Sequence, residues 1–136
     1  MLQSKRTGPF VFNKTYTMNI EEFREHCIVK KGVTEEFPFD ASTLVFKVMG
    51  KMFALVPLER IPSQANLKCD PERAIELREI YDGKIIAGYH MSKVHWNTLY
   101  LEGLSPLLVR ELIDHSYELV VNGLTKKVQA QLKALD

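Results

Sequence analysis

The sequence contains no apolar run that approaches the ~20 residues a helix needs to cross a bilayer. Near the N-terminus, Lys5 and Arg6 are followed only by the apolar patch Pro9–Phe12, which is too short for the apolar region of a signal peptide. No small-residue cleavage site follows this patch. We therefore expect a cytoplasmic protein that does not insert into a membrane.

Cysteine is scarce, with only Cys27 and Cys69 in 136 residues and no CxxC pair. The two could form a disulfide, but without an export signal reduced thiols are expected. We expect both to be buried as small apolar side chains rather than to act in redox chemistry. The sequence also lacks internal repeats and low-complexity tracts. A chain of this length with 46% hydrophobic residues can bury one core without cross-links.

A large excess of charge is also missing, because 18 basic and 17 acidic residues leave a net charge of +1. Residues 1–18 carry +3, so the remainder sums to −2, a poor balance for a protein that wraps DNA. However, residues 41–69 sum to +3 and residues 83–101 to +2, which leaves −7 for the rest of residues 19–136. A nearly neutral protein can thus present one attractive basic face.

Four helices are predicted, because a capping residue precedes each apolar stripe of helical spacing. The expected N-caps are Asn19, Asp70, Ser105 and Thr125. Glu22 completes a capping box with Asn19. Prolines 71 and 106 support the second and third helix, because proline is favoured in a first helical turn.

Strands are predicted where the apolar period changes to two. Residues 44–49 and 51–57 are expected to form a hairpin, with a tight turn at Met49-Gly50 and Phe46 across from Phe53. Lys47 and Lys51 would lie near its tip. Shorter strands are expected at residues 66–69, 84–87 and 95–101.

The order of these elements predicts an α+β two-layer sandwich, with an antiparallel sheet of about five strands and helices on one face. Residues 18–136 are expected to form this single domain. Residues 1–17 show no sustained period and contain Gly8-Pro9, so we expect an extension that is flexible or weakly docked. We expect the protein to be a monomer.

The densest group of reactive side chains is residues 88–97, Gly-Tyr-His-Met-Ser-Lys-Val-His-Trp-Asn. A metal site is not expected, because no carboxylate lies in this window and Cys69 is the only distal thiolate available. Ser92 lacks the glycine-flanked turn of a nucleophile, and no nearby acid would orient His95. Asp114-His115-Ser116 contains triad residue types, but successive helical residues point in different directions.

Two binding functions remain open for this segment. A nucleic-acid surface would use lysines on phosphates, aromatic rings for stacking and Asn97 to read adenine. A small-molecule or anion-binding pocket, or a cryptic enzyme, would draw the same residue types together. Its lining would be Lys68, His90, Lys93, His95, Trp96 and Asn97. Trp96 could also be a core residue.

The chain resembles the MmcQ/YjbR-like family from Met18 to about Leu132. The similar segments are residues 18–23, 32–39, 44–48, 51–55, 66–72, 88–93, 95–97 and 114–117. The resemblance implies a frataxin-like (CyaY-like) sandwich and DNA binding by two hairpin wings, residues 43–56 and 84–101. The residues expected to contact DNA are Lys47, Lys51, Lys68, Lys93, His95 and Asn97. No catalysis, cofactor or metal is expected.

Overall fold

The computed structural model describes residues 17–88 and 91–136, so the predicted extension, apart from Thr17, and His90 lie outside it. The helices are α2 (Ile20–Ile28), α3 (Pro71–Ile80), the 3-10 turn η1 (Leu101–Gly103), α4 (Pro106–Asn122) and α5 (Lys126–Lys133). The strands are β1 (Val33–Glu36), β2 (Thr43–Val48), β3 (Lys51–Pro57), β4 (Gln64–Lys68), β5 (Ile85–Ala87) and β6 (Trp96–Tyr100).

The strands form one antiparallel sheet in the order β1-β2-β3-β4-β6-β5. The predicted α+β sandwich is confirmed, and the described residues form a sheet of six strands instead of about five. The additional strand is β1, an edge strand whose burial alternates but whose sequence, Val-Thr-Glu-Glu, has one apolar residue. A polar edge strand gives no period-two hydrophobic signal, which is why the sequence did not predict it.

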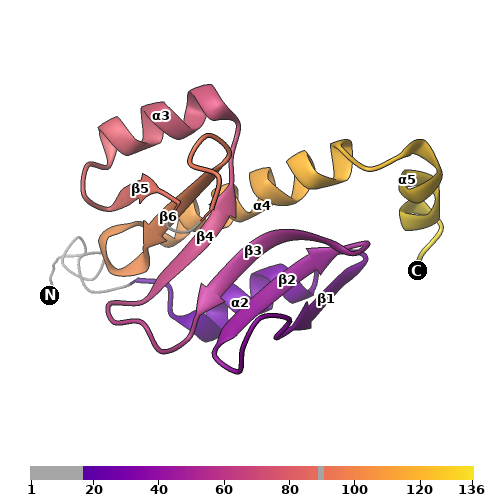
Figure 1. The fold of residues 1–136 in the computed structure, drawn as a ribbon, viewed down its shortest axis with the longest axis horizontal. Coiled ribbons are helices and arrows are strands. Elements are labelled where there is room, and N and C mark those ends of the chain that lie inside the picture. Colours follow the sequence, from indigo (N-terminus) through magenta and orange to yellow (C-terminus); the bar gives the residue numbers. More distant parts are fainter. Residues whose placement is uncertain (1–16, 89–90) are drawn as a thin grey trace, which may run out of the picture.

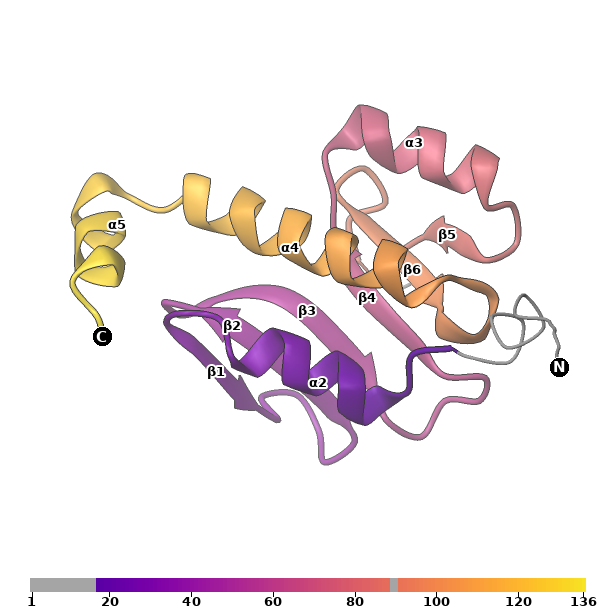
Figure 2. The same cartoon turned by 180° about the vertical axis from the view of Figure 1, so that it is seen from behind.

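One face of the sheet carries the helices. In Figure 2, α2 and α4 cross in front of the strands, while Figure 1 shows the opposite face of β1, β2 and β3 without a helix over it. The main core lies between these layers and includes Phe23, Phe46 and Phe53, each fully buried. A smaller apolar cluster, Val45, Leu55 and Trp96, lies on the helix-free face.

The four predicted N-caps are confirmed. The capping box of α2 is complete, because Asn19 Oδ1 accepts from Glu22 N at 2.8 Å and Glu22 Oε1 accepts from Asn19 N at 3.0 Å. Side chains of the other three caps also accept from the backbone of their helices. These short-range contacts satisfy amides that the first helical turn leaves unpaired, so local sequence is enough to predict them.

The β2–β3 hairpin departs from its predicted register. Phe46 lies across from Ala54 instead of Phe53, and the register shifts between Phe46 and Lys47. The predicted register holds only at the tip, where Lys47 faces Met52. The bulge leaves Phe53 as an extra residue in β3, and both Phe53 and Ala54 are buried in the main core. A bulge of this kind depends on packing from another element and is not predictable from turn chemistry alone.

None of the helices in the described ranges has the length and hydrophobicity to span a membrane. Both cysteines are buried, and neither forms a disulfide. Burial raises the pKa of the Cys27 thiol, and it raises that of Cys69 to about 11. Neither thiol is therefore ionised at neutral pH, as expected for buried apolar side chains.

Candidate nucleic-acid interface

The two hairpin tips lie at the same end of the sheet. β3 and β6 both run antiparallel to β4, so these two strands start at the same end. The first tip is the turn Met49-Gly50 before β3, and the second lies before β6, where the structure describes residues 91–95. The topology therefore directs both predicted wings the same way, although each remains part of one continuous sheet.

A gap separates β3 from β4 at this end. Only Ala54–Leu67 and Leu55–Asn66 pair between the two strands, and Figure 1 shows α4 passing behind the gap. Ser116 of α4 fills the next ladder position, because its Oγ donates to Phe53 O at 2.6 Å and accepts from Lys68 N at 2.9 Å. A helix side chain thus replaces a strand-to-strand hydrogen bond and spreads the two strands apart.

A hollow of about 280 Å³ lies in this gap, and it brings together two of the predicted lysines, Lys51 and Lys68, with Trp96. Its remaining lining comes from Met52 and from the end of α4, including Gly123. The carbonyl end of a helix carries partial negative charge. The hollow is therefore a poor binding site for a small anion. Its two lysines are better suited to bind phosphates outside the hollow.

The other predicted contact residues fall into different environments. Lys93 and His95 are exposed in the second tip. Lys47 is half-buried on β2 and pairs with Glu36 of β1 at 3.1 Å, which offsets its charge. Asn97 is 1% exposed and faces α3, where its Nδ2 donates to Ala74 O at 3.3 Å.

The position of Asn97 corrects the expectation that it reads a base. Arg78 of α3 donates to Asn97 Oδ1 at 2.8 Å, so both ends of the amide are engaged inside the fold. The same guanidinium donates to Lys93 O at 3.3 Å and ties the second tip to α3. Asn97 therefore supports the tip and does not form part of a surface.

The predicted pocket is not assembled as expected. Lys68 and Trp96 line the hollow, but Lys93 and His95 lie outside it and Asn97 is on the opposite face of β6. His90 is outside the described residues. Side-chain alternation in a strand explains the separation, because neighbours such as Trp96 and Asn97 must point to opposite faces.

The sequence reasoning missed a group of lysines beside the first tip. Residues 29–33, 48–52 and 122–136 contain six lysines and one acid, a formal charge of 6 − 1 = +5. Their proximity is shown by Leu132 and Met49, which both pack against Gly32. We call the exposed lysines of this group the basic end. They are Lys31, Lys51, Lys126, Lys127 and Lys133.

The connection between α5 and the rest of the basic end is tertiary. Lys31 Nζ donates to Lys133 O at 2.9 Å, and Met49 N donates to Gly32 O at 3.2 Å. Figures 1 and 2 both show α5 beside the β2–β3 tip. The lysine-rich start of α5 was visible in the sequence, but nothing local indicated that it lies against a turn some 75 residues earlier.

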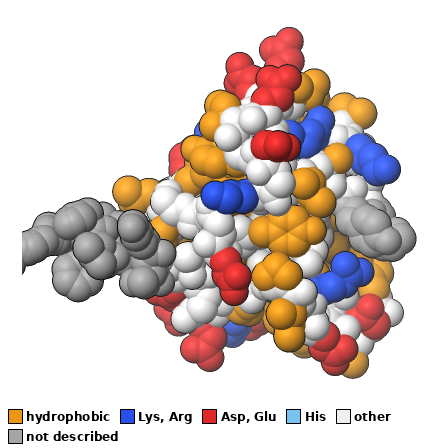
Figure 3. Space-filling view, turned by 90° about the vertical axis from the view of Figure 1, so that its left-hand side faces the viewer, with side chains coloured by type: hydrophobic (Ala, Val, Ile, Leu, Met, Phe, Trp, Pro, Cys, Tyr) orange, Lys and Arg blue, Asp and Glu red, His pale blue; other side chains and the backbone are white. Residues whose placement is uncertain are grey.

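The side of the molecule that faces left in Figure 1 carries both signs of charge. Figure 3 shows the side of the molecule that is on the left in Figure 1, where acidic and basic side chains are interspersed among hydrophobic ones. The acids concentrate in the helices. Examples are Glu21, Glu22 and Glu25 in α2, and Glu72, Glu76 and Glu79 in α3. A chain with a net charge of +1 therefore has a pronounced charge asymmetry.

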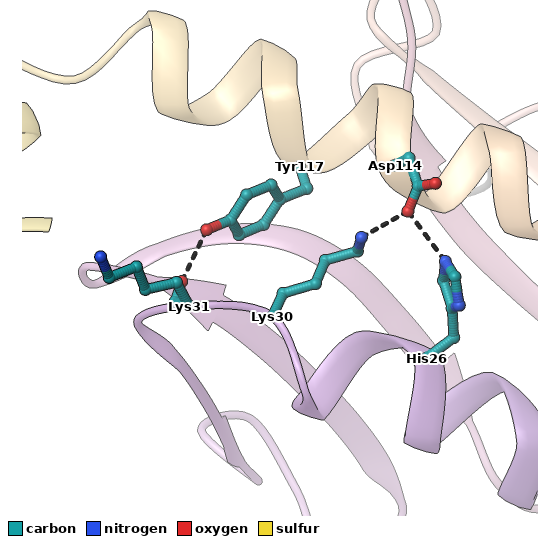
Figure 4. Close-up of polar contacts among 5 residues, drawn as sticks. All are labelled: His26, Lys30, Lys31, Asp114 and Tyr117. Carbon is teal, nitrogen blue, oxygen red and sulfur yellow. Dashed lines mark hydrogen bonds and ion pairs between the residues drawn. The ribbon is translucent and has the colours of Figure 1, made fainter. Parts of the chain in front are cut away.

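The segment Asp114-His115-Ser116-Tyr117 joins α4 to its neighbours. Asp114 Oδ1 accepts from Lys30 and lies 2.8 Å from His26 Nε2, and Tyr117 Oη donates to Lys31 O at 2.6 Å (Figure 4). Burial by itself raises the pKa of Asp114, but hydrogen bonds from Lys30 and His26 outweigh it and lower that pKa. These contacts hold α4 against α2 and the turn that follows it. The role of Asp114 and Tyr117 is therefore structural.

His115 connects α4 to α3. Its Nε2 accepts a hydrogen bond from Asp70 N at 3.1 Å, at the N-cap of α3. The accepting nitrogen must be unprotonated. Burial, followed by the nearby charge of Arg73, lowers the pKa of His115. The adjacent ion pair of Arg73 with Glu111 also joins α3 to α4 and holds the pKa of Glu111 low.

We expect His115 to make stability depend on pH. Since its pKa is lower in the folded than in the unfolded protein, its contribution is complete above about pH 6.5 and is lost as the pH falls below that value. Urea unfolding between pH 8 and pH 5 should show a steeper loss of stability for the wild type than for His115→Gln. Equal pH profiles for the two proteins would contradict this prediction.

Within the described ranges, no group of three or more His, Cys, Asp or Glu side chains could hold a metal ion.

Comparison with known proteins identifies the relatives of this chain. The model of the family described as YjbR matches residues 29–119. The chain is 41% identical over 98 residues to the uncharacterized protein YbdF of Escherichia coli O157:H7, covering 71% of this chain and 80% of that protein. It is 31% identical over 119 residues to the uncharacterized protein YjbR of Escherichia coli strain K12, covering 87% and 100%.

Solved structures show the same fold. A Deinococcus radiodurans protein with a DUF419 domain superposes with a TM-score of 0.78 at 39% identity, covering 84% of this chain and 87% of that one. A Pseudomonas syringae protein superposes with a TM-score of 0.64 at 29% identity, covering 75% and 98%. The chain therefore belongs to the YjbR family.

Proposed function

We propose that this protein binds nucleic acid through the basic end and the two hairpin tips. The observation that carries the proposal is the convergence of exposed lysines from a turn, a hairpin and α5 at one end of a protein with a net charge of only +1. Lys68 borders the same gap, and Lys93 extends the surface to the second tip. Such a charge arrangement orients a polyanion towards one end of the protein.

The expected contacts are to phosphates. Exposed lysines on flexible stems act as point charges that suit a phosphate backbone. Asn97, the one predicted contact residue that was expected to read a base, is buried and hydrogen-bonded inside the fold. We therefore expect modest affinity with little sequence preference, dominated by the release of counterions.

The salt dependence of binding tests this proposal. For about four phosphate contacts, log Kobs for a short labelled duplex should fall with log[salt] with a slope of about −3 to −4 in anisotropy titrations. The variant Lys51→Gln/Lys127→Gln should reduce that slope by about 2 and weaken binding roughly tenfold or more. Both side chains are exposed, so stability should change little.

The matched control is Lys84→Gln/Arg110→Gln, which removes the same charge away from the basic end. It should leave the slope nearly unchanged. If both double variants weaken binding equally, only net charge matters and the proposed surface is wrong. Lys93→Gln, measured in the same way, shows whether the second tip also touches the duplex, in which case the slope falls by about 1.

A further inference from the structure

A second concave site lies on the helix-free face of the sheet. It is a groove of about 420 Å³, a size that suits a small molecule. Gln64 and Asn66 form one polar wall, because they are two residues apart in β4 and so share one face of the strand. Thr43 and Arg60 are the other polar residues of the lining. Its apolar walls include Met52, Leu55 and Met91.

Gln64 is the feature that indicates a ligand. The residue is only 7% exposed, and within the described ranges its carboxamide has no hydrogen-bond partner. A buried carboxamide without a partner is costly and uncommon in folded proteins. Leucine or methionine would fill the same space without this cost, so the polar group is better explained by something that enters the groove.

Asn66 adds to the same wall. Its Oδ1 accepts from the hydroxyl of Thr98 on β6, which fixes the amide plane. In the described structure its Nδ2 has no acceptor, and so remains able to donate into the groove. The wall therefore offers hydrogen-bond donors and an acceptor side by side. The carboxamide of Gln64 alone can donate one hydrogen bond to a ligand and accept another from it.

The apolar side chains that line the groove favour a ligand with a flat, apolar ring. Met52 and Met91 pack against the cluster of Val45, Leu55 and Trp96, and their flexible thioethers adapt to a ring. Phe39 lines the groove and is 63% exposed, so its ring is available to cover a ligand.

We propose that this groove binds a small planar molecule with a cyclic-amide edge, such as a pyrimidinedione or another unsaturated lactam. The ligand N–H donates to the carbonyl oxygen of Gln64, and the ligand carbonyl accepts from the Gln64 amide nitrogen. The ring lies between the methionines and Phe39. The groove uses none of the lysines of the basic end, but Met91 belongs to the second tip and Met52 also lines the hollow between the tips. Free uracil, which carries no phosphate, therefore separates this proposal from nucleic-acid binding.

Methyl NMR of protein labelled at the methionine methyl groups provides the test, with uracil as the probe. Uracil at millimolar concentration should shift the Met52 and Met91 methyl signals saturably. Met18, which is 2% exposed in the main core, serves as an internal reference that should not move. 1,3-Dimethyluracil has the same ring but no N–H donor, and it should bind at least about tenfold more weakly.

Gln64→Leu removes the carboxamide and should weaken uracil binding by at least about tenfold, while the melting temperature stays equal or rises. Gln131→Leu on exposed α5 is the matched control and should bind like the wild type. The proposal is overturned if uracil shifts neither methyl, if dimethyluracil binds equally well, or if Gln64→Leu retains wild-type affinity. The comparison of the two probes holds even if Gln64→Leu fails to fold.

A base belonging to a nucleic acid could present the same edge, so an oligothymidine strand is tested in parallel. Lys51→Gln/Lys127→Gln should leave the shifts caused by free uracil unchanged. If oligothymidine shifts these methyls and uracil does not, the groove serves nucleic acid and the free-ligand proposal is wrong.

Discussion

Replacing Ser116 with valine is expected to lower the free energy of unfolding by about 2–4 kcal/mol. Ser116 is fully buried, and its hydroxyl satisfies both Phe53 O and Lys68 N where β3 and β4 separate. Valine cannot make either hydrogen bond, so it leaves a buried carbonyl and a partly buried amide without partners, and it adds a second γ-carbon at a fully buried position. The strands cannot easily close to pair with each other, because α4 occupies the gap.

Urea unfolding followed by circular dichroism measures this effect. Ser92→Val is the matched control, because Ser92 is exposed in the second tip, and it should change stability by no more than about 0.5 kcal/mol. Ser116→Ala tests the same hydrogen bonds without added bulk and should also destabilise. A loss below about 0.5 kcal/mol in both Ser116 variants would show that β3 and β4 pair directly when the hydroxyl is absent.

Gly88→Ala is expected to destabilise the protein by about 1–3 kcal/mol and to disturb the second tip. A Cβ at this position would lie 2.8 Å from Trp96 Cβ and 3.0 Å from Trp96 O. Both atoms belong to the adjacent strand, and Gly88 N donates to the same Trp96 oxygen at 2.8 Å. The strand cannot yield without breaking that hydrogen bond, so β5 and β6 must separate at the start of the tip.

Gly123→Ala separates this clash from the general effect of losing a glycine. Gly123 caps α4 with φ −87°, and its nearest contacts for a Cβ are 3.5 Å away or more. Alanine there should be neutral or stabilise by about 0.4–1 kcal/mol, because it reduces the entropy of the unfolded chain. Thermal unfolding of both variants distinguishes the two effects, because only Gly88→Ala should lower the melting temperature. Equal melting temperatures for Gly88→Ala and Gly123→Ala would mean that β6 accommodates the methyl group added at position 88 without strain.

If Gly88→Ala folds, it also tests the proposed interface. Trp96 borders the gap between the two tips, and Lys93 extends from the second. A displaced second tip should weaken duplex binding about as much as Lys93→Gln does, if that tip contacts phosphate. Unchanged binding would limit the interface to the basic end.

Much of the fold could be predicted from short segments. Asn19, Asp70, Ser105 and Thr125 cap their helices as expected, because a cap is a contact across three residues. The β2–β3 hairpin was also predictable, because alternating apolar residues flank a tight turn. The bulge at Phe53 was not, because the side chain that hydrogen-bonds to Phe53 O belongs to Ser116, 63 residues away.

The candidate interface was predicted only in part. Lys51 and Lys93 lie near the tips of their hairpins, as their sequence positions indicated. Lys47 could not be recognised as paired, because its partner Glu36 belongs to a strand that sequence did not reveal. Asn97 faces the core because the phase of β6 is set by packing against α3.

The sequence by itself determined the element types, the α+β class and the two lysine-bearing tips, because caps, turns and periodicity are local interactions. Only the tertiary structure decided which charges gather at one end and which polar groups are buried. α5 reaches the first tip through Leu132 against Gly32, and Gln64 enters the groove through the register of β4. Both depend on the packing of distant segments, for which one sequence carries no direct signal.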